Sequence, residues 1–328
     1  MNFSKIMFLM MMMISTLITI NSQNWLGMWM GMEMNLMFFI PVMSKMKNKK
    51  SSQAMMIYFL AQSMGSIILL FSILINSFIM ISPVMMNKLI EMMLIISLLI
   101  KLGVAPFHNW FLEVLYNMNW KEAFLLMTWQ KVAPLFILSN IIMNNFIYII
   151  IMLTTLIGAI GGINYSSIMK IMGYSSINHM GWMLLMMKYN NMWYKYLILY
   201  SIILFTCYLF FSKNNLYFIN QLSFNMKSNM EKLNYMIIML SMAGLPPFMG
   251  FLPKWIVINS SINNNILIIM FMIMMSLLTL FYYLKIINSL LFVYSSTNKW
   301  IKIKSNNFMI YLFMLNFMLP AFSIIEFF

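Results

Sequence analysis

The chain has 328 residues, of which 63% are hydrophobic and only 8% are charged. About a quarter of the residues in a soluble globular domain are charged, so this composition excludes a soluble domain and a disordered tail. The formal net charge is +14, but every basic residue is lysine, and the lysines are scattered between apolar runs. Because nucleic-acid binding needs basic residues, arginine above all, gathered on one exposed face, we expect no nucleic-acid partner.

Hydrophobic segments follow one another along the whole chain. A helix needs about 20 apolar residues to cross the bilayer core, and the sequence predicts about eleven such helices. This predicts an all-α polytopic membrane protein, a single transmembrane domain over residues 1–328 without a soluble domain. The predicted segments are residues 5–21, 24–43, 53–78, 86–116, 122–143, 145–164, 167–187, 192–212, 233–260, 264–293 and 307–327.

The lysines in the connections support this count. Lysine accumulates on the side of the membrane from which insertion proceeds. With eleven crossings and the N-terminus on that side, thirteen connecting lysines fall on it and three fall on the other, namely Lys88, Lys188 and Lys195. The two ends of the chain are therefore expected on opposite sides.

Five charged residues lie inside the predicted helices: Glu33, Lys101, Lys131, Lys254 and Lys285. A charge at the bilayer centre costs at least about 2.5 kcal/mol on insertion scales, so such a residue is a functional hypothesis by default. Lys285 lies towards a segment end, where its ammonium can reach the interface.

Two of the predicted segments are long and interrupted by the related sequences Gly103–Phe107 and Gly244–Phe248. Proline removes a backbone donor, and the freed polar groups must point into protein or a wet cavity. Paired broken helices point to a transport site built from internal repeats. The two broken helices are five crossings apart, which predicts an inverted repeat.

The internal charges could form a proton relay. Lys101 is the expected partner of Glu33, and Lys131 and Lys254 would continue a line of titratable sites that polar groups such as His179 could bridge. A structural ion pair at Glu33 and a packing role for His179 remain alternatives. Glu91 is expected to pair locally with Lys88, and Glu113 and Glu122 are expected in a solvated connection.

The chain lacks the ligands for a redox centre. It contains one cysteine, Cys207, and two histidines, His108 and His179, which lie far apart in the sequence. This excludes a disulfide framework, a cysteine-ligated cluster and a recognisable metal-site spacing. We therefore expect no metal and no cofactor on this chain.

Several motifs resemble a known family. They are residues 24–35, 101–108, 127–131, 157–162, 174–182 and 243–255, and they resemble, in order along the chain, subunit 2 of NADH:ubiquinone oxidoreductase, respiratory complex I. A composition rich in Met, Ile, Asn, Lys and Phe resembles that of A+T-rich mitochondrial genes of animals, insects in particular. The loops around 213–232 and 295–306 match least.

The resemblance implies an antiporter-like fold of two inverted five-helix repeats in the mitochondrial inner membrane. The N-terminus would face the matrix, and the C-terminus would face the intermembrane space. By this resemblance, Glu33 would be the conserved acid of the family and Lys101 its ion-pair partner. Lys131 would be the central relay, and Lys254 would be the site towards the exit half. His179 matches a position whose role is less settled.

The expected function is that of a membrane-arm subunit of a proton-translocating NADH:ubiquinone reductase. The resemblance implies that NADH, FMN, iron–sulfur clusters and ubiquinone act elsewhere in the complex. Expected partners are other membrane-arm subunits and membrane lipids, with cardiolipin as a candidate. Two rivals stay open, a free-standing cation/proton antiporter and a structural subunit whose lysines only fix helix packing.

Overall fold

A computed structural model describes residues 3–44, 48–78, 83–141, 145–225, 229–293, 313, 314 and 316. The described residues form helices together with one isolated β-bridge between Ser167 and Phe218. The chain divides into two compact units, residues 1–144 and 145–328. The eleventh predicted segment, 307–327, lies outside the described residues apart from three of them.

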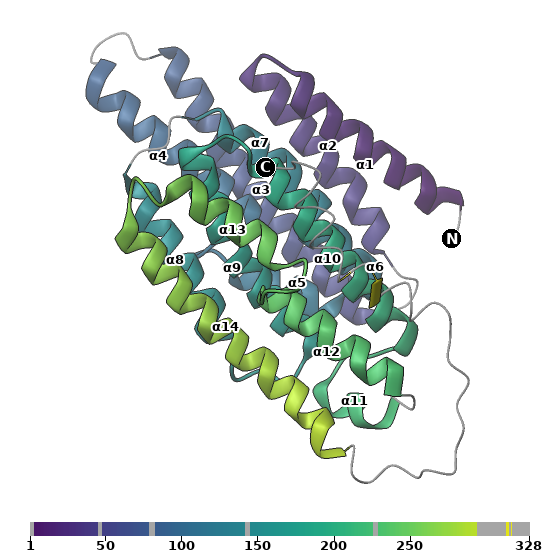
Figure 1. The fold of residues 1–328 in the computed structure, drawn as a ribbon. Helices are drawn as coiled ribbons and strands as arrows, with labels where there is room; N and C mark the ends of the chain where they lie inside the picture. Colours follow the sequence, from purple (N-terminus) through teal and green to yellow (C-terminus); the bar gives the residue numbers. More distant parts are fainter. Residues whose placement is uncertain are drawn as a thin grey trace. The chain divides into compact units, whose positions relative to one another are not determined.

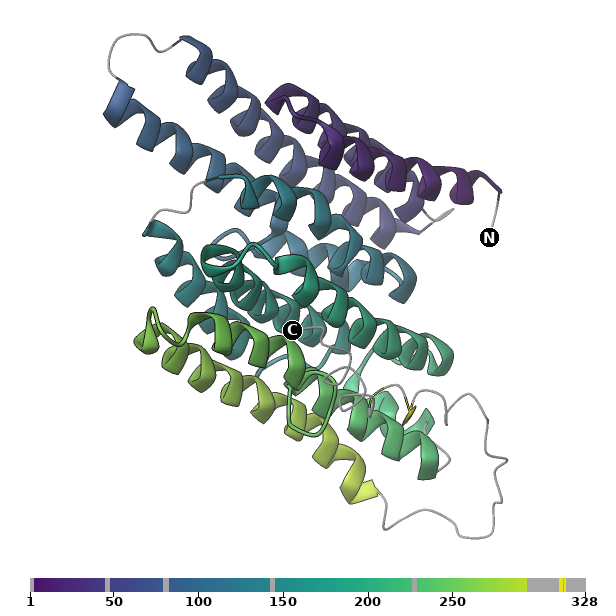
Figure 2. The same ribbon diagram turned by 45° about the horizontal axis from the view of Figure 1, so that its top comes forward.

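The first unit places its helices in antiparallel pairs. α1 packs against α2, and α3 packs against α4, as Figures 1 and 2 both show. α3 also contacts α5. The predicted fourth segment is broken between α4 and α5, as the Gly-Pro sequence indicates. The elements are α1 (Phe3–Asn21), α2 (Trp25–Met43), α3 (Lys49–Phe78), α4 (Pro83–Leu102), α5 (Asn109–Asn117), α6 (Trp120–Met127), the 3₁₀ helix η1 (Trp129–Lys131) and α7 (Val132–Ser139).

The second unit is built around α9. Nearly every residue of this helix from Ile168 to Met187 is buried, because α8, α10, α13 and α14 all contact it. Figure 1 shows α14 lying along α8. The elements are α8 (Phe146–Gly161), α9 (Ile168–Tyr189), α10 (Trp193–Asn214), α11 (Ile219–Asn225), α12 (Asn229–Ala243), α13 (Phe251–Ser261) and α14 (Ile266–Val293).

Five of the described helices are long and apolar enough to cross a membrane by themselves: α1, α2, α3, α10 and α14. Eleven crossings are therefore not confirmed. α8, α12 and α13 have 16, 15 and 11 residues, and the last predicted segment lies almost entirely outside the described residues. α9 is long enough, but it carries Ser175, Ser176, Asn178 and His179 on a surface covered by protein. A helix enclosed by other helices does not need the hydropathy of a lipid-facing one.

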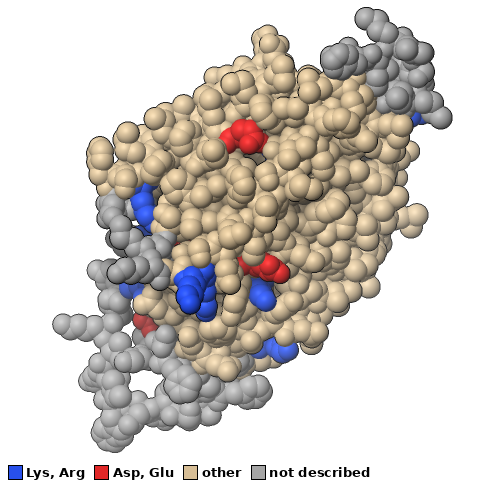
Figure 3. Space-filling view, turned by 180° about the vertical axis from the view of Figure 1, so that it is seen from behind, with Lys and Arg blue, Asp and Glu red and all other residues tan. Residues whose placement is uncertain are grey.

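Large apolar side chains cover the outer faces. On α1, Met7, Met10 and Leu17 are exposed, and on α14, Leu267 is 86% exposed. Figure 3 shows one face of the molecule on which charged side chains are few and uncharged residues dominate. Such a surface is suited to lipid or to neighbouring membrane subunits.

One sequence expectation is wrong. Glu122 is not solvated but buried at 8% exposure, because it is the third residue of α6 and caps that helix. Its carboxylate accepts the backbone N–H of Asn119 at 3.0 Å, which forms a capping box. Glu113 is exposed, as expected, although it lies within α5.

Candidate functional site

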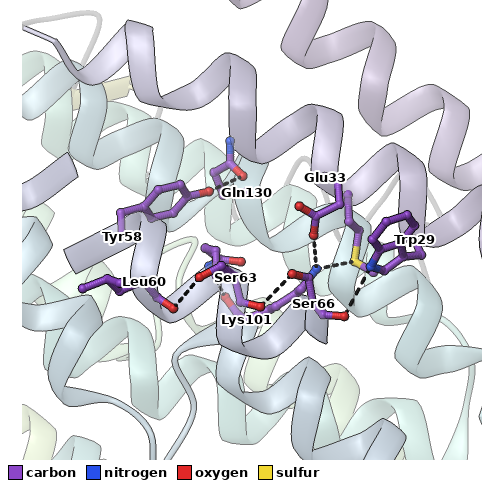
Figure 4. A network of polar contacts seen from close by, with 10 residues as sticks. Trp29, Glu33, Tyr58, Leu60, Ser63, Ser66, Lys101 and Gln130 are labelled. Atoms are coloured by element: carbon purple, nitrogen blue, oxygen red, sulfur yellow. Dashed lines mark hydrogen bonds and ion pairs between the residues drawn. The ribbon is translucent and has the colours of Figure 1, made fainter. Parts of the chain in front are cut away.

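Glu33 and Lys101 meet inside the first unit. The Lys101 ammonium lies 3.7 Å from a carboxylate oxygen of Glu33, as Figure 4 shows, and 3.9 Å from the sulfur of Met32. The Lys101 side chain is 3% exposed and that of Glu33 is 29% exposed. The predicted pairing is therefore found, with Glu33 less enclosed than its position in the middle of a helix suggests.

Close helix packing encloses Lys101. A Cβ placed on Gly65 of α3 would lie 2.9 Å from Cγ of Lys101 and 3.1 Å from the carbonyl oxygen of Ser97. Only glycine therefore allows α3 to approach α4 so closely at this point. The Gln62 amide, one turn earlier on α3, donates to the Lys101 carbonyl at 2.9 Å.

The chain turns sharply just after Lys101. Gly103 has φ +66°, its N–H donates to Ile100, and the N–H of Val104 donates to Leu99. This is the Schellman arrangement, in which a left-handed residue ends a helix and satisfies its last carbonyls. The Trp110 indole also donates to the Ile100 carbonyl at 3.1 Å. Lys101 thus lies in the last turn of α4, where the helix dipole favours a cation.

Gln130 connects three helices beside this pair. Its amide donates to Asn35 on α2 at 3.1 Å and to the sulfur of Met12 on α1 at 3.2 Å, and its oxygen lies 3.3 Å from the Tyr58 hydroxyl on α3. Asn35 lies two residues after Glu33, so the network reaches the helix that carries the acid. The sequence prediction missed Gln130, Asn35, Tyr58 and Gln62 as site residues. Amide side chains inside apolar segments were the available signal.

Lys131 follows Gln130 at the end of η1. It is 3% exposed, and its ammonium lies 5.6 Å from the centre of the Phe111 ring. The predicted helix over 122–143 is interrupted here, because α6 ends at Met127 and α7 begins at Val132. This interruption places Gln130 and Lys131 in a short 3₁₀ turn between two α-helices inside the unit.

Lys254 lies just after the corresponding break in the second unit, at the start of α13 (Phe251–Ser261). Its ammonium donates to the carbonyl of Ala243, the last residue of α12, at 2.6 Å, and the side chain is buried. Gly244 has φ +79°, and a Cβ there would lie 2.9 Å from the Lys254 nitrogen. Glycine suits the left-handed turn, and its lack of a Cβ also leaves room for the Lys254 side chain.

The two breaks have the same backbone hydrogen bonds. Gly244 N–H donates to Ser241 and Leu245 N–H donates to Leu240, which repeats the pattern at Gly103 and Val104. A proline with a cis peptide bond also follows in each, at Pro106 and Pro247. The sequence similarity between the two segments therefore corresponds to a shared local structure.

His179 is buried at the centre of α9. Its Nδ1 lies 2.7 Å from the Tyr196 hydroxyl, and its ring centre lies 4.8 Å from that of Tyr200. A histidine with one ring nitrogen hydrogen-bonded has a fixed orientation. This geometry suits either a relay or a packing role.

Two other residues from the sequence analysis have local roles. His108 Nδ1 lies 3.1 Å from the Pro106 carbonyl, within the first break. The exposed Lys285 side chain donates to the Ile163 carbonyl at 3.3 Å, as expected for a lysine that reaches outward. Among the described residues, no three His, Cys, Asp or Glu side chains gather to hold a metal ion.

Known proteins share both sequence and fold with this chain. The NADH:quinone oxidoreductase/Mrp antiporter transmembrane family matches residues 22–281. NADH-ubiquinone oxidoreductase chain 2 of Anopheles gambiae is 42% identical, over 93% of this chain and 90% of its own length. The same protein of Locusta migratoria is 39% identical, over 94% of this chain and 92% of its own length.

A solved structure supports the fold. A chain of respiratory complex I from Thermus thermophilus superposes with a TM-score of 0.80, at 18% identity, over 88% of this chain and 71% of that one. The fold is thus an all-helical, antiporter-like one, and the protein is a multi-pass membrane protein. The chain belongs to the NADH:quinone oxidoreductase/Mrp antiporter family and, within it, to the NADH-ubiquinone oxidoreductase chain 2 proteins.

Proposed function

We propose that this chain is a membrane-arm subunit of a proton-translocating NADH:ubiquinone reductase and moves protons while electron transfer takes place in other subunits. Membership of the chain 2 family supports this, as does the fold shared with a complex I chain. The observation that carries the proposal is the Glu33–Lys101 pair at 3.7 Å, at the broken end of α4. The proposed partners are the other membrane-arm subunits and lipids, with cardiolipin as a candidate.

The proposed topology has about eleven crossings and two inverted repeats in the mitochondrial inner membrane. The lysine-rich side faces the matrix, and the C-terminus lies in the intermembrane space. Both units lie in the membrane as one transmembrane domain without a soluble part. The repeated hydrogen-bond pattern at Gly103 and Gly244 supports the repeat, and the lysine asymmetry supports the orientation.

In the proposed mechanism, charge changes at Glu33 control the proton on Lys101. Two opposite charges 4 Å apart stabilise each other by roughly 4 kcal/mol at an effective dielectric constant of 20. When Glu33 gains a proton, Lys101 loses this stabilisation, and its enclosed ammonium gives up a proton more readily. Quinone reduction elsewhere in the complex would supply the initial change of charge.

Lys131 would respond next. It directly follows Gln130, whose amide bonds Asn35 on the helix of Glu33, and charges interact strongly in an interior of low dielectric. Lys254 in the second unit would then pass charge to the other side, with His179 as the proposed intermediate carrier. Iron–sulfur clusters are proposed to bind other subunits, because this chain has a single cysteine, Cys207, which is buried. NADH, FMN and ubiquinone are proposed to bind other subunits as well, as the family resemblance implies.

The decisive experiment measures protons pumped per NADH oxidised in the intact complex carrying Glu33→Gln or Lys131→Met. Loss of pumping is expected in both variants. Lys285→Met is the matched control, since that lysine is exposed, and it should pump normally. Normal assembly and pumping by all three variants would contradict the proposal and favour a structural subunit.

Native electrophoresis tests the proposed partners and the antiporter rival. After mild detergent extraction, this chain should be identified by its peptides in the band that oxidises NADH. A chain that migrates alone, and whose isolated form exchanges cations for protons, would instead establish the free-standing antiporter.

A further inference from the structure

Lys232 is a buried lysine that the relay described above does not use. It lies near the start of α12, on the lysine-rich side of the predicted topology, and it is 1% exposed. Other connecting lysines that the structure describes on this side, such as Lys49, Lys121 and Lys213, are exposed. Lysine is rarely buried so completely, so Lys232 calls for an explanation beyond membrane orientation.

Tyr235 continues the same face of α12, because residues three apart share a face of a helix. It is 0% exposed, and its ring lies 5.8 Å from that of Phe210 and 6.1 Å from that of Phe211, near the end of α10. Its hydroxyl has no hydrogen-bond partner among the described residues. A buried hydroxyl is normally hydrogen-bonded, so this one is suited to bind internal water.

Further hydroxyls continue inward to His179 across three helices. On α14, Tyr283 is 1% exposed and lies within electrostatic range of both Tyr235 and Tyr200. On α10, the ring centre of Tyr200 lies 4.8 Å from that of His179. The hydroxyl of Ser176, on α9 beside His179, approaches that of Tyr200. The three tyrosines therefore connect the face of Lys232 with the histidine.

This series runs from one end of the second unit towards its middle. At 1.5 Å per residue, Lys232 lies about 4.5 Å and Tyr235 about 9 Å from the start of α12, and His179 lies about 16 Å from the start of α9. α12 contacts α10 and α14, and both of these contact α9. Figure 1 shows the start of α12 and the end of α14 at the same end of this unit.

We propose that Lys232 is the site at which the second unit takes up protons from the lysine-rich side, and that Tyr235, Tyr283 and Tyr200 conduct them to His179. The inference rests on the proposed proton-translocating function and adds an uptake step to it. A hydroxyl can both accept and donate a proton. Each tyrosine therefore takes a proton from one neighbour, directly or through water, while it passes its own proton to the next.

The uptake route agrees with the direction of the proposed relay. For each proton that binds Lys232 from the solution, one proton arrives on the His179 imidazole, and no other reactant is consumed. His179 then supplies Lys254, from which the proton leaves on the lysine-poor side. Uptake and release thus lie at opposite ends of the second unit.

The main test is Tyr235→Phe and Tyr283→Phe in the assembled complex. Each change removes one hydroxyl and adds no volume. NADH:ubiquinone turnover per assembled complex should fall by roughly tenfold, because a positioned proton donor and acceptor is lost. The ratio of turnover in H₂O to turnover in D₂O should rise, because proton uptake becomes the slow step.

The matched control is Tyr194→Phe, at a tyrosine that is 47% exposed, and it should change neither turnover nor the isotope effect. A purely structural role of the buried hydroxyls predicts a lower abundance of the complex with an unchanged isotope effect. That result, or normal turnover in both buried-tyrosine variants, would overturn the proposal.

Lys232→Arg and Lys232→Met separate proton uptake from a role of the charge alone. Arginine keeps the positive charge but does not release its proton, so an uptake site predicts slow turnover in both variants. Normal turnover in Lys232→Arg would overturn the proposal. Lys213→Met, at an exposed lysine of the same side, should turn over normally. If the larger arginine prevents assembly, the two tyrosine variants decide.

Glu33→Gln, measured in parallel, separates this inference from the proposed function. If Glu33→Gln abolishes pumping while the Lys232 and tyrosine variants turn over and pump normally, only the uptake route fails. If Glu33→Gln pumps normally, the proposed function itself fails.

Discussion

The Lys254 ammonium and Gly244 face each other across the second helix break: a Cβ on Gly244 would lie 2.9 Å from the lysine nitrogen. The same ammonium donates to the carbonyl of Ala243, at the end of α12. A helix C-terminus stabilises a cation, so the break itself forms the environment of this lysine. The lysine and the glycine therefore act as one structural unit.

Gly244→Ala should impair both folding and pumping. A left-handed conformation costs an L-residue about 1 to 2 kcal/mol, and the added methyl group would displace the Lys254 ammonium. We expect a several-fold lower abundance of the complex and fewer protons pumped per NADH by the complex that assembles. Both are measured on isolated inner membranes.

Gly103→Ala is the matched control for this prediction. Gly103 also has a positive φ, but its Cβ would meet Cβ of Phe111 at 2.8 Å. Abundance should fall to a similar extent, whereas pumping per assembled complex should fall less. An identical pumping defect in both variants would show that the contact between Gly244 and the Lys254 ammonium does not contribute to pumping.

Glu33 and Lys101 should behave as an energetically coupled pair. Removing one partner leaves an enclosed charge without compensation, whereas removing both leaves none. We expect Glu33→Gln and Lys101→Met each to destabilise the folded complex by about 1 to 3 kcal/mol of free energy. This is less than the cost of breaking a fully buried pair, because the Glu33 side chain is 29% exposed. The double variant should be more stable than the sum of the two losses predicts.

Thermal inactivation of NADH:ubiquinone turnover in the three variants measures this coupling. Strict additivity would mean that the two charges do not interact, despite the distance of 3.7 Å.

Gln130→Met should weaken the first unit. The substitution keeps the length of the side chain but removes its hydrogen bonds to Asn35 and Tyr58, and a buried polar group left without a partner costs about 1 to 3 kcal/mol. We expect lower thermal stability and slower turnover. Gln53→Met, at an exposed position of α3, should change neither, and a normal Gln130→Met complex would argue against the network.

Much of the architecture could be predicted from the sequence, because helices and their breaks are determined by residues that are close together in the chain. The breaks after Lys101 and before Lys254 are predicted from Gly-Pro sequences, and both are confirmed. The Glu33–Lys101 contact is also confirmed, since an acid inside an apolar helix needs a cation. The relay roles of these residues stay predictions.

Long-range side-chain contacts could not be predicted in the same way. The Gln130 network joins Met12, Asn35 and Tyr58, which are far apart in the sequence, and no periodicity encodes such a meeting. The sequence also did not predict the interruption at η1. Pro134 indicates that the helix is weakened nearby, but no residue marks the end of α6 at Met127. Glu122 was placed wrongly, because its capping box was overlooked.

Asn265 illustrates a contact that only the fold shows. Its amide donates to the hydroxyls of Tyr148 and Tyr189, at 2.7 and 2.8 Å, and so joins α8, α9 and the start of α14. Asn265→Ala should lower thermal stability by about 1 to 3 kcal/mol, because two hydroxyl groups lose a donor, and should leave pumping per NADH unchanged. Asn264→Ala, at the exposed neighbouring position, should have no effect on thermal inactivation.

Tyr196→Phe tests the two roles proposed for His179. The change removes only the hydroxyl that lies 2.7 Å from the imidazole, and Tyr194→Phe makes the same change at an exposed position. A relay histidine should lose its orientation, and pumping per NADH should fall in Tyr196→Phe at unchanged abundance. If His179 only packs, Tyr196→Phe should destabilise the fold by about 1 kcal/mol. The abundance of the complex should then fall, and pumping per NADH should stay unchanged.

The break between α12 and α13 also bears on how the chain enters the membrane during synthesis. α12 has 15 residues and α13 has 11, so at 1.5 Å per residue they are about 22 and 16 Å long, and neither spans a core of about 30 Å. Lys254 lies in the second half and bonds the end of the first. The first half is therefore too short to cross the core by itself, and the crossing is complete only when the second half, with Lys254, has been added to it.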